Sequence, residues 1–153
     1  RTEVSTTEYL NALLKLPYLD AVVNETLRLD PIVPDVLRTL SVDKKVGQYT
    51  YPVGTHLGVV SALIHAREDF YPEPDQFNPE RWINHKPRPW TFFPFGGGAR
   101  RCIGAALAIA EVKIVLAEVV RTLQLDITRK EHSKRVNIVM APAHGVKAVV
   151  RKL

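Results

Sequence analysis

A ten-residue stretch, Phe95-Gly96-Gly97-Gly98-Ala99-Arg100-Arg101-Cys102-Ile103-Gly104, carries the residue types best suited to chemistry. Cys102 is the only cysteine, and it stands just before a long apolar segment that predicts a helix. Unpaired N–H groups and the positive end of the dipole at a helix N-terminus favour a thiolate over a thiol. The glycines let a flat, bulky group approach the backbone closely, and Arg100 and Arg101 supply cations for its acidic substituents. The stretch therefore predicts a binding loop whose anionic ligand is Cys102.

Other chemistries of glycine loops and cysteines compete for this stretch. A nucleotide-binding P-loop needs Gly-Lys-Ser/Thr after the glycines, where this chain has Ala99-Arg100-Arg101. A cysteine phosphatase needs an arginine six residues after the cysteine, and that position holds Ala108. A buried structural cysteine that caps a helix stays open as an interpretation. A Cys–His hydrolase also stays open, because spacing excludes none of the five histidines: His56, His65, His85, His132 and His144.

The loop resembles the haem-binding signature of the cytochrome P450 superfamily, the haem-thiolate monooxygenases. All of the signature's fixed positions are matched, by Phe95, Gly98, Arg100, Cys102 and Gly104. The resemblance implies that Cys102 is the axial thiolate of haem iron and the metal ligand. It also implies that Arg100 pairs with a haem propionate, that Phe95 packs under the ring near the sulfur, and that Gly98 and Gly104 shape the cofactor-binding loop.

Two further motifs follow the order found in the same family. Glu25-Thr26-Leu27-Arg28 matches its Glu-x-x-Arg helix, and Phe77-Asn78-Pro79-Glu80-Arg81-Trp82 is similar to its Pro-Glu-Arg meander motif. Alone, a glutamate and an arginine three residues apart form a surface pair worth about 0.2–0.5 kcal/mol. The resemblance instead implies a buried structural network of Glu25, Arg28 and Arg81. It also implies that Arg38, expected at the start of the first strand, is a second propionate-binding arginine.

The resemblance implies a function for the intact protein. Members of the family are oxidoreductases that insert one oxygen atom from O₂ into an apolar organic substrate, with haem b as cofactor and electrons from a redox partner. The local sequence of residues 16–20 and 93–98 resembles that of bacterial or cyanobacterial members of the family. We expect substrate contacts from residues 32–37 and from Met140 and Ala141. The partner is expected to be an acidic ferredoxin, flavodoxin or reductase that docks near Arg101 and Lys113, with Arg88 and Lys86 close by.

Hydrophobic periodicity predicts the helices that position these motifs. Apolar residues recur at three- and four-residue spacing over 5–16 and 17–29, and Pro17 and Pro31 mark the breaks. A segment at 61–67 predicts one or two further turns. The long segment 103–123 is apolar around most of its circumference, which predicts a buried helix.

Short β-branched and aromatic runs predict the strands. Those between residues 36 and 60 predict one small antiparallel sheet, and prolines and aromatic residues over 72–94 predict an ordered, irregular meander. The C-terminal part predicts strands over 125–128, 136–140 and 146–150, with a hairpin tip at 141–145. The predicted fold class is mainly α with small β-sheets, an α+β arrangement that the resemblance identifies as the C-terminal part of the cytochrome P450 fold.

Composition limits the function classes. The 153 residues include 21 Lys and Arg against 16 Asp and Glu, a formal charge of +5 that is too mild to predict nucleic-acid binding. A single cysteine excludes an internal disulfide and a multi-thiolate zinc site. No segment approaches the roughly 20 apolar residues of a membrane helix, so a bacterial protein would be cytoplasmic, with a membrane anchor upstream of residue 1 left open.

The N-terminal residues 1–4 lack an initiator methionine and a signal region, so we expect an interior cut. The expected organisation is one segment, 1–153, of a single larger domain without an internal boundary. The missing N-terminal part would then hold the helices over the distal face of the haem. The alternative hypothesis is a truncated or split, non-catalytic piece that binds haem weakly or serves as a structural subunit.

Overall fold

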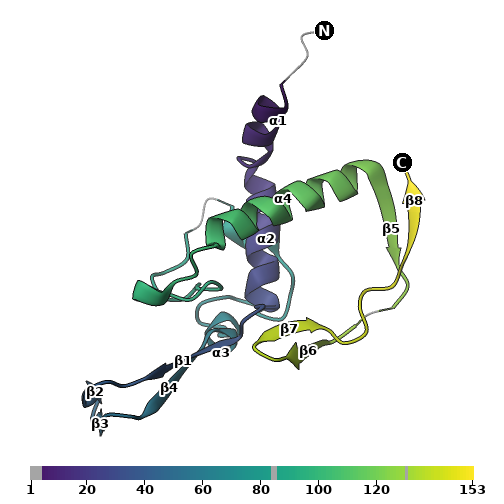
Figure 1. The fold of residues 1–153 in the computed structure, drawn as a ribbon. Helices are drawn as coiled ribbons and strands as arrows, with labels where there is room; N and C mark the ends of the chain where they lie inside the picture. The colour runs from purple at the N-terminus through teal and green to yellow at the C-terminus, as the bar shows by residue number, and fades with distance from the viewer. Residues whose placement is uncertain (1–4, 84–85, 130) are drawn as a thin grey trace.

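The computed structural model describes residues 5–83, 86–129 and 131–153. Two helices form its centre: α2 (Pro17–Leu29) is crossed by α4 (Ala105–Thr122), and α1 (Thr6–Leu13) precedes α2 (Figure 1). Ser5 caps α1 reciprocally with Glu8, since its Oγ accepts from the Glu8 N–H at 3.2 Å and its own N–H donates to the Glu8 carboxylate at 2.9 Å. α2 has the predicted bounds. α1 ends three residues before the predicted Leu16, because Pro17 forces Leu16 out of the helical region.

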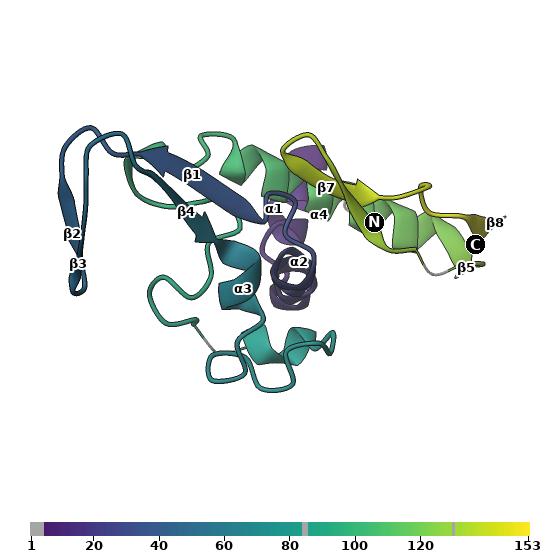
Figure 2. The same cartoon turned by 90° about the horizontal axis from the view of Figure 1, so that it is seen from below.

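The strands of residues 35–60 form two sheets rather than the single predicted one. β1 (Asp35–Thr39) pairs with β4 (His56–Val60), and β2 (Lys44–Val46) pairs with β3 (Tyr49–Tyr51), both antiparallel. The ladder is interrupted because Gly54 turns with a φ of 84° and the Val53 N–H donates to the Asp43 side chain at 2.8 Å. Figure 2 shows the β2–β3 pair at the far end of the β1–β4 pair.

The segment after β4 leads back to α2. Helix α3 (Ser61–His65) occupies the predicted place, and the irregular meander that follows contains one short 3₁₀ helix, η1 (Pro79–Trp82). A second 3₁₀ turn, η2 (Gly98–Arg100), lies in the cysteine loop. The meander therefore packs against α2 through η1 while the loop leads directly into α4.

The prediction of a buried helix over 103–123 is wrong. Among the described residues of α4, only Ala105 and Lys113 are buried, while Leu107, Val115 and Val120 are exposed. Because apolar residues occur around most of the helix circumference, the sequence predicts packing neighbours on all sides of this helix. In the part of the chain that the structure describes, α4 contacts α1, α2 and β5, which cover one side of it.

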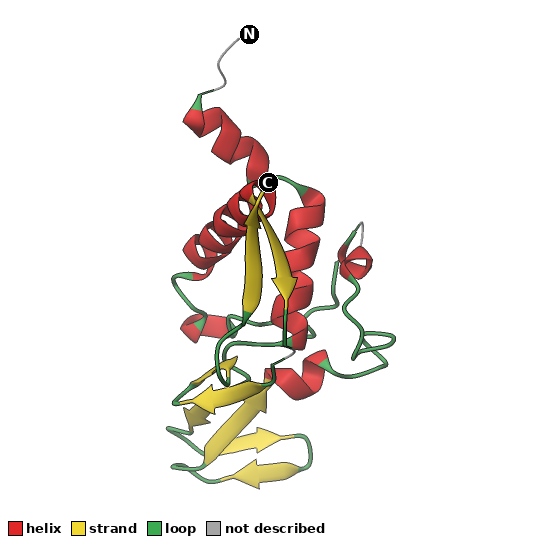
Figure 3. Ribbon diagram, turned by 90° about the vertical axis from the view of Figure 1, so that its right-hand side faces the viewer, coloured by secondary structure: helices red, strands yellow, loops and turns green. Residues whose placement is uncertain are grey.

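The C-terminal strands pair differently from the prediction. β5 (Leu123–Ile127) pairs with β8 (Ala148–Lys152), and β6 (Ser133–Val136) forms a hairpin with β7 (Val139–Pro142). The hairpin tip lies at Asn137 and Ile138 rather than at 141–145, because Asn137 adopts the left-handed φ of 56° that a tight turn requires. Figure 3 shows the β5–β8 ladder alongside the helices and the other strands gathered below it.

The β6–β7 hairpin is tied to the segment that joins α2 to β1. The Met140 N–H donates to the Ile32 carbonyl at 2.7 Å, the Ser133 hydroxyl donates to Asp30 at 3.1 Å, and Arg135 pairs with Asp35.

None of the described helices is both long and apolar enough to cross a membrane.

Candidate functional site

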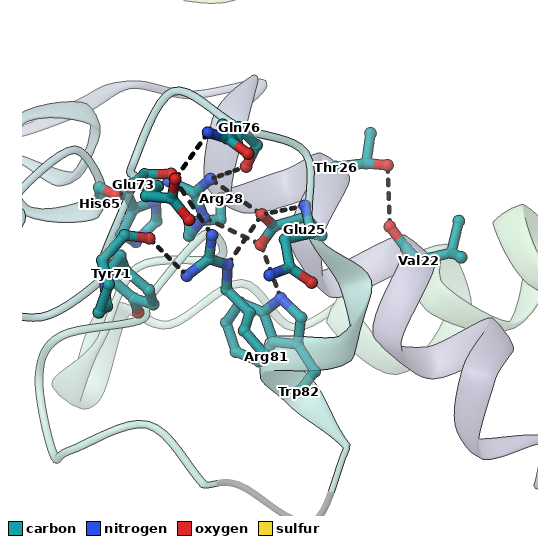
Figure 4. Close-up of polar contacts among 12 residues, drawn as sticks. Val22, Glu25, Thr26, Arg28, His65, Tyr71, Glu73, Gln76, Arg81 and Trp82 are labelled. Carbon is teal, nitrogen blue, oxygen red and sulfur yellow. Dashed lines mark hydrogen bonds and ion pairs between the residues drawn. The ribbon is translucent and has the colours of Figure 1, made fainter.

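Glu25 of α2 is the centre of a buried polar network (Figure 4). Its carboxylate is fully buried and accepts five hydrogen bonds: from Arg28 Nε and Nη2, both at 2.9 Å, from Arg81 Nε at 3.0 Å, from the Asn78 N–H at 3.0 Å and from Trp82 Nε1 at 2.8 Å. The structure thus brings together Glu25, Arg28 and Arg81, the three residues expected to form a network. Sequence reasoning missed Trp82, although it follows Arg81 directly.

The two arginines also hold backbone carbonyls of the meander. Arg28 donates to the carbonyls of His65 at 2.9 Å and Gln76 at 3.3 Å, and Arg81 donates to that of Pro72 at 3.0 Å. The Arg28 guanidinium lies 5.3 Å from the centre of the Tyr71 ring, a cation–π distance. The network therefore fixes the meander, which has little regular hydrogen bonding of its own, onto α2.

The environment of Glu25 favours its charged form. Burial alone would raise the pKa of this carboxyl, but the hydrogen bonds from Arg28, Asn78 and Trp82, with the charge of Arg28, outweigh burial and lower the pKa below its ordinary value. The carboxylate is therefore ionised near neutral pH and paired with the two guanidinium groups.

His65, the last residue of α3, is fully buried in an aromatic cluster. Its ring lies 5.4 Å from Phe92 and 5.5 Å from Phe93, centre to centre, and its Nε2 accepts the Phe93 N–H at 3.2 Å. Burial, and after it the charge of Arg28, lower the pKa of His65 from 6.5 to about 4, so the ring is neutral near pH 7. Its Nδ1 has no hydrogen-bond partner among the described residues. These are packing and backbone contacts, as expected of a residue with a structural role.

The cysteine loop is held by its own backbone. The Cys102 N–H donates to the Phe95 carbonyl at 3.0 Å, and the Gly96 N–H donates to the Phe93 carbonyl at 2.9 Å. Gly98 has a φ of +67°, a conformation that favours glycine. Cys102 precedes α4, as the sequence predicts, but the helix begins at Ala105 rather than at the predicted residue 103. Cys102 is exposed and not a buried structural cysteine. Gly104 is the residue that precedes α4, and a Cβ built on it would lie 3.9 Å from the Cys102 sulfur.

Two adjoining cavities bring the other expected site residues together. A cavity of about 330 Å³ is lined by Cys102, Arg100 and Phe95 together with apolar residues of α2 and of the segment before β1. A second, of about 350 Å³, is lined by Arg38, Gly98 and Trp90. The two cavities share Val36 and Phe93 as wall residues. The first cavity is lined by Leu27, Ile32, Val33, Val36, Ser61, Phe93, Pro94, Phe95, Gly96, Arg100 and Cys102. The second is lined by Val36, Arg38, Val59, Ile64, Trp90, Phe93, Gly97 and Gly98.

Some expected residues take other positions. Arg38 is the fourth of the five β1 residues rather than the first, and its Nη1 donates to the Leu37 carbonyl at 2.8 Å. Of the expected substrate segment 32–37, Ile32, Val33 and Val36 line the first cavity, but Met140 and Ala141 line neither cavity. Met140 reaches this region only through its backbone bond to Ile32.

Trp90 is a cavity residue that sequence reasoning missed. It adopts a φ of 65°, unusual for a residue with a side chain, and its ring lies so close to Gly97 that an added Cβ would come within 2.8 Å of it. No periodicity marks such a position, because the segment between Trp90 and Gly97 has no regular helix or strand.

None of the described histidines lines either of these two cavities, so none of them is placed as a base beside Cys102. His56 bonds to Thr39 at 2.8 Å, and the rings of His132 and His144 lie 6.3 Å apart. His85 falls outside the described residues. Within the described ranges, no cluster of three His, Cys, Asp or Glu side chains could hold a metal ion.

Lys113 is not part of an exposed docking surface, contrary to the prediction. It is buried, its Nζ donates to the Leu14 carbonyl at 2.9 Å, and it pairs with Asp20, so it fastens α4 to α2. Arg101, Arg88 and Lys86 are exposed, as a docking surface requires.

Comparison with known proteins identifies the fold. The solved structure of the retinoic-acid-bound cyanobacterial CYP120A1 matches all of this chain with a TM-score of 0.84 and 29% identity, over 35% of that protein's length. Two structures of a cytochrome P450DA heme domain match it with a TM-score of 0.85 at 23% identity. The predicted α+β fold class, a part of the cytochrome P450 fold, is confirmed.

Sequence comparison gives the same family. The chain is 40% identical over 136 residues to cytochrome P450 135B1 of Mycobacterium tuberculosis, an alignment of 88% of this chain and 29% of the relative. It is 35% identical over 142 residues to mouse cytochrome P450 4V2, covering 90% of this chain and 27% of that protein. The chain thus spans less than a third of the length of these relatives. The sequence model described as "Cytochrome P450" matches residues 6–147, and the chain therefore belongs to the cytochrome P450 family.

Proposed function

We propose that residues 1–153 are the haem-binding segment of a single larger cytochrome P450 domain. The intact protein is then a monooxygenase that inserts one oxygen atom from O₂ into an apolar substrate, using electrons from a redox partner. One observation carries the proposal: Cys102 and Arg100 line one cavity whose other walls are mainly apolar.

The cavity walls fit a haem b group. A thiolate is a common protein ligand of haem iron, and Cys102 is the only thiol in the chain. Two arginines, Arg100 beside one cavity and Arg38 beside the other, could pair with two acidic substituents on a flat ring. Gly98 adds no side chain to the second cavity, and a Cβ built on it would meet nothing within 4 Å.

Each residue has a definite role in this proposal. Cys102 would ligate the iron and supply electron density to it, Arg100 and Arg38 would hold the propionates, and Phe95 would shield the sulfur side from water. Haem, when bound, supplies the oxygen chemistry, which no side chain of this segment provides. Glu25, Arg28 and Arg81 act at one remove, by holding the meander against α2.

The substrate and the location are part of the same proposal. Ile32, Val33 and Val36 offer an apolar wall, which suits an apolar small molecule. The related CYP120A1 was solved with retinoic acid, so an elongated isoprenoid is a sensible first substrate to test. If the protein is bacterial, we propose a cytoplasmic location.

We propose an acidic electron donor, a ferredoxin, flavodoxin or reductase, that is attracted by the exposed cations Arg101, Arg88 and Lys86. These cations are exposed, and Arg101 is the neighbour of Cys102 in the loop. Opposite charges speed the encounter of the two proteins.

The test of the proposal is Cys102→Ser in the full-length protein. The reduced wild-type protein with carbon monoxide should show the red-shifted Soret band typical of thiolate ligation, and the variant should lose it. Ser61→Ala is the matched control, because Ser61 lines the same cavity and its hydroxyl donates only to backbone carbonyls, that of Pro34 at 3.0 Å and that of Val33 at 3.3 Å. An unchanged band in Cys102→Ser would show that another group ligates the iron.

The second candidate function is a non-catalytic piece, and the exposed apolar face of α4 favours it for the segment alone. Leu107 and Val115 of α4 are more than 60% exposed, and Ile103, two residues before the helix, is fully exposed. Such apolar surfaces promote association. We expect residues 1–153 expressed alone with haem and an electron donor to yield no hydroxylated product. Sustained, coupled turnover by the segment, with the full-length protein as positive control, would refute this expectation.

A further inference from the structure

His65 links the buried network to the loop that carries Cys102. Its backbone carbonyl accepts from Arg28 Nη1 at 2.9 Å, while its ring Nε2 accepts from the Phe93 N–H at 3.2 Å. His65 is 0% exposed, so water does not reach its carbonyl or its ring. One residue therefore holds an arginine of α2 with its main chain and the start of the cysteine loop with its side chain.

The contact continues along the loop to Cys102. The Phe93 carbonyl accepts from the Gly96 N–H at 2.9 Å, and the Phe95 carbonyl accepts from the Cys102 N–H at 3.0 Å. Phe93 and Phe95 also line the cavity beside Cys102. The segment 93–95 is therefore at once the partner of the Cys102 backbone and a wall of its cavity, and the His65 ring is what anchors its first residue.

Packing alone does not explain an imidazole at this position. The ring is surrounded by Tyr71, Phe92 and Phe93, and a phenylalanine would suit such neighbours. Because the neutral ring accepts at Nε2, its proton lies on Nδ1, which has no partner among the described residues. An unpaired buried N–H is costly. The feature that imidazole adds over a hydrocarbon ring is the acceptor for Phe93.

We propose that His65 is a positioning residue for the Cys102 loop: its Nε2 fixes the Phe93 N–H, and through segment 93–95 it holds Cys102 in the position from which the thiolate ligates iron. This inference rests on the proposed haem-thiolate function. It assigns to His65 an effect on the state of the iron ligand, and not only on folding.

The test compares two variants of the full-length, haem-loaded protein that differ in one property. Gln and Met have similar length and lack the ring, but the Gln side-chain oxygen can accept the Phe93 N–H and the Met sulfur accepts only weakly. In the reduced protein with carbon monoxide, the thiolate-ligated and thiol-ligated forms have separate Soret bands. Relative to His65→Gln, we expect His65→Met to raise the ratio of thiol to thiolate form about tenfold, the change that about 1.4 kcal/mol produces.

A matched control separates positioning from stability. Tyr71→Phe removes a buried hydrogen bond of the same cluster, the 2.9 Å bond from the Tyr71 hydroxyl to the Thr91 carbonyl, and leaves the Phe93 N–H bonded to His65. We expect Tyr71→Phe to lower the melting temperature without changing the ratio of the two bands.

The outcomes are distinct. Haem loading by His65→Gln but not by His65→Met would indicate a role in folding alone and would overturn the proposal. Equal ratios in the two variants, failure of both to load haem, or an equal shift in Tyr71→Phe would overturn it. Absence of the thiolate band in the wild-type protein would instead refute the proposed function, since that result does not depend on residue 65.

Discussion

Glu25→Ala removes the one carboxylate shared by both network arginines, so it should be among the most destabilising single changes in the chain. The substitution leaves the Asn78 N–H and Trp82 Nε1 without the acceptor they have in the structure. It also leaves Arg28, which is 2% exposed, with two carbonyls and no countercharge.

The magnitude follows from these losses. Arg28 and Arg81 each keep backbone acceptors, so the guanidinium groups remain partly satisfied. Removing one partner of a buried ion pair costs about 3–5 kcal/mol. Each polar hydrogen left unpaired can cost about 1–3 kcal/mol. We therefore expect the free energy of unfolding to fall by about 3–5 kcal/mol, with only part of the unpaired-group cost added because the site can relax.

The assay is urea unfolding of the full-length protein, with haem occupancy measured in parallel. Glu118→Ala is the control, because Glu118 also pairs with an arginine three residues on, Arg121, but at the surface. Glu118 also accepts from the Tyr9 hydroxyl at 3.0 Å, and water can replace both partners there. The reasoning is refuted if the two variants lower the urea midpoint equally.

The pH dependence of this loss has a definite sign. The pKa of Glu25 is lowered in the folded protein because hydrogen bonds, mainly from Arg28, outweigh burial. The contribution of Glu25 is therefore complete above its ordinary pKa and is lost as pH falls through its folded pKa. The difference between wild type and Glu25→Ala should shrink on acidification.

Three further predictions concern the loop and its support. Burial, and after it the charge of Arg28, lower the pKa of His65 to about 4, so between pH 6.5 and 4 this residue is protonated mainly in the unfolded chain. The free energy of unfolding should therefore fall by about 3 kcal/mol over that range. Urea unfolding of His65→Gln should lack this pH-dependent loss, and identical pH profiles of the two proteins would contradict the prediction. Gly98→Ala places a side chain on a residue with a φ of +67°, which should lower the free energy of unfolding by about 1–2 kcal/mol and reduce haem occupancy. The control is Gly104→Ala, whose Cβ would lie at an ordinary 3.9 Å from the Cys102 sulfur, and its melting temperature should be nearly unchanged. Arg101→Glu should slow reduction by an acidic donor at low salt. Its difference from the wild-type rate should become smaller as the Debye length falls to about 8 Å at 0.15 M salt. The control is Lys152→Glu, the same charge change on β8, and equal stopped-flow rates for the two variants would exclude a docking role for Arg101.

The sequence alone determined the elements whose signals are local. Pro17 and Pro31 define α2, because proline restricts its own φ and the residue before it. The residue types of the loop 95–104 and the Glu-x-x-Arg spacing likewise required no tertiary knowledge to single out. These features depend on residues that are close together in the chain, so the sequence alone is enough to predict them.

Tertiary structure decided what depends on distant neighbours. Apolar periodicity over α4 could not show that Val115 is exposed or that Lys113 is buried, since both depend on which elements lie alongside. The β5–β8 pairing and the turn at Asn137 depend on a choice among strands that alternation leaves open. The same holds for Trp82 on Glu25 and His65 on Phe93, which join residues 57 and 28 positions apart. A pattern along the chain marks which residues are apolar or charged, but burial and partnership are properties of the packed molecule.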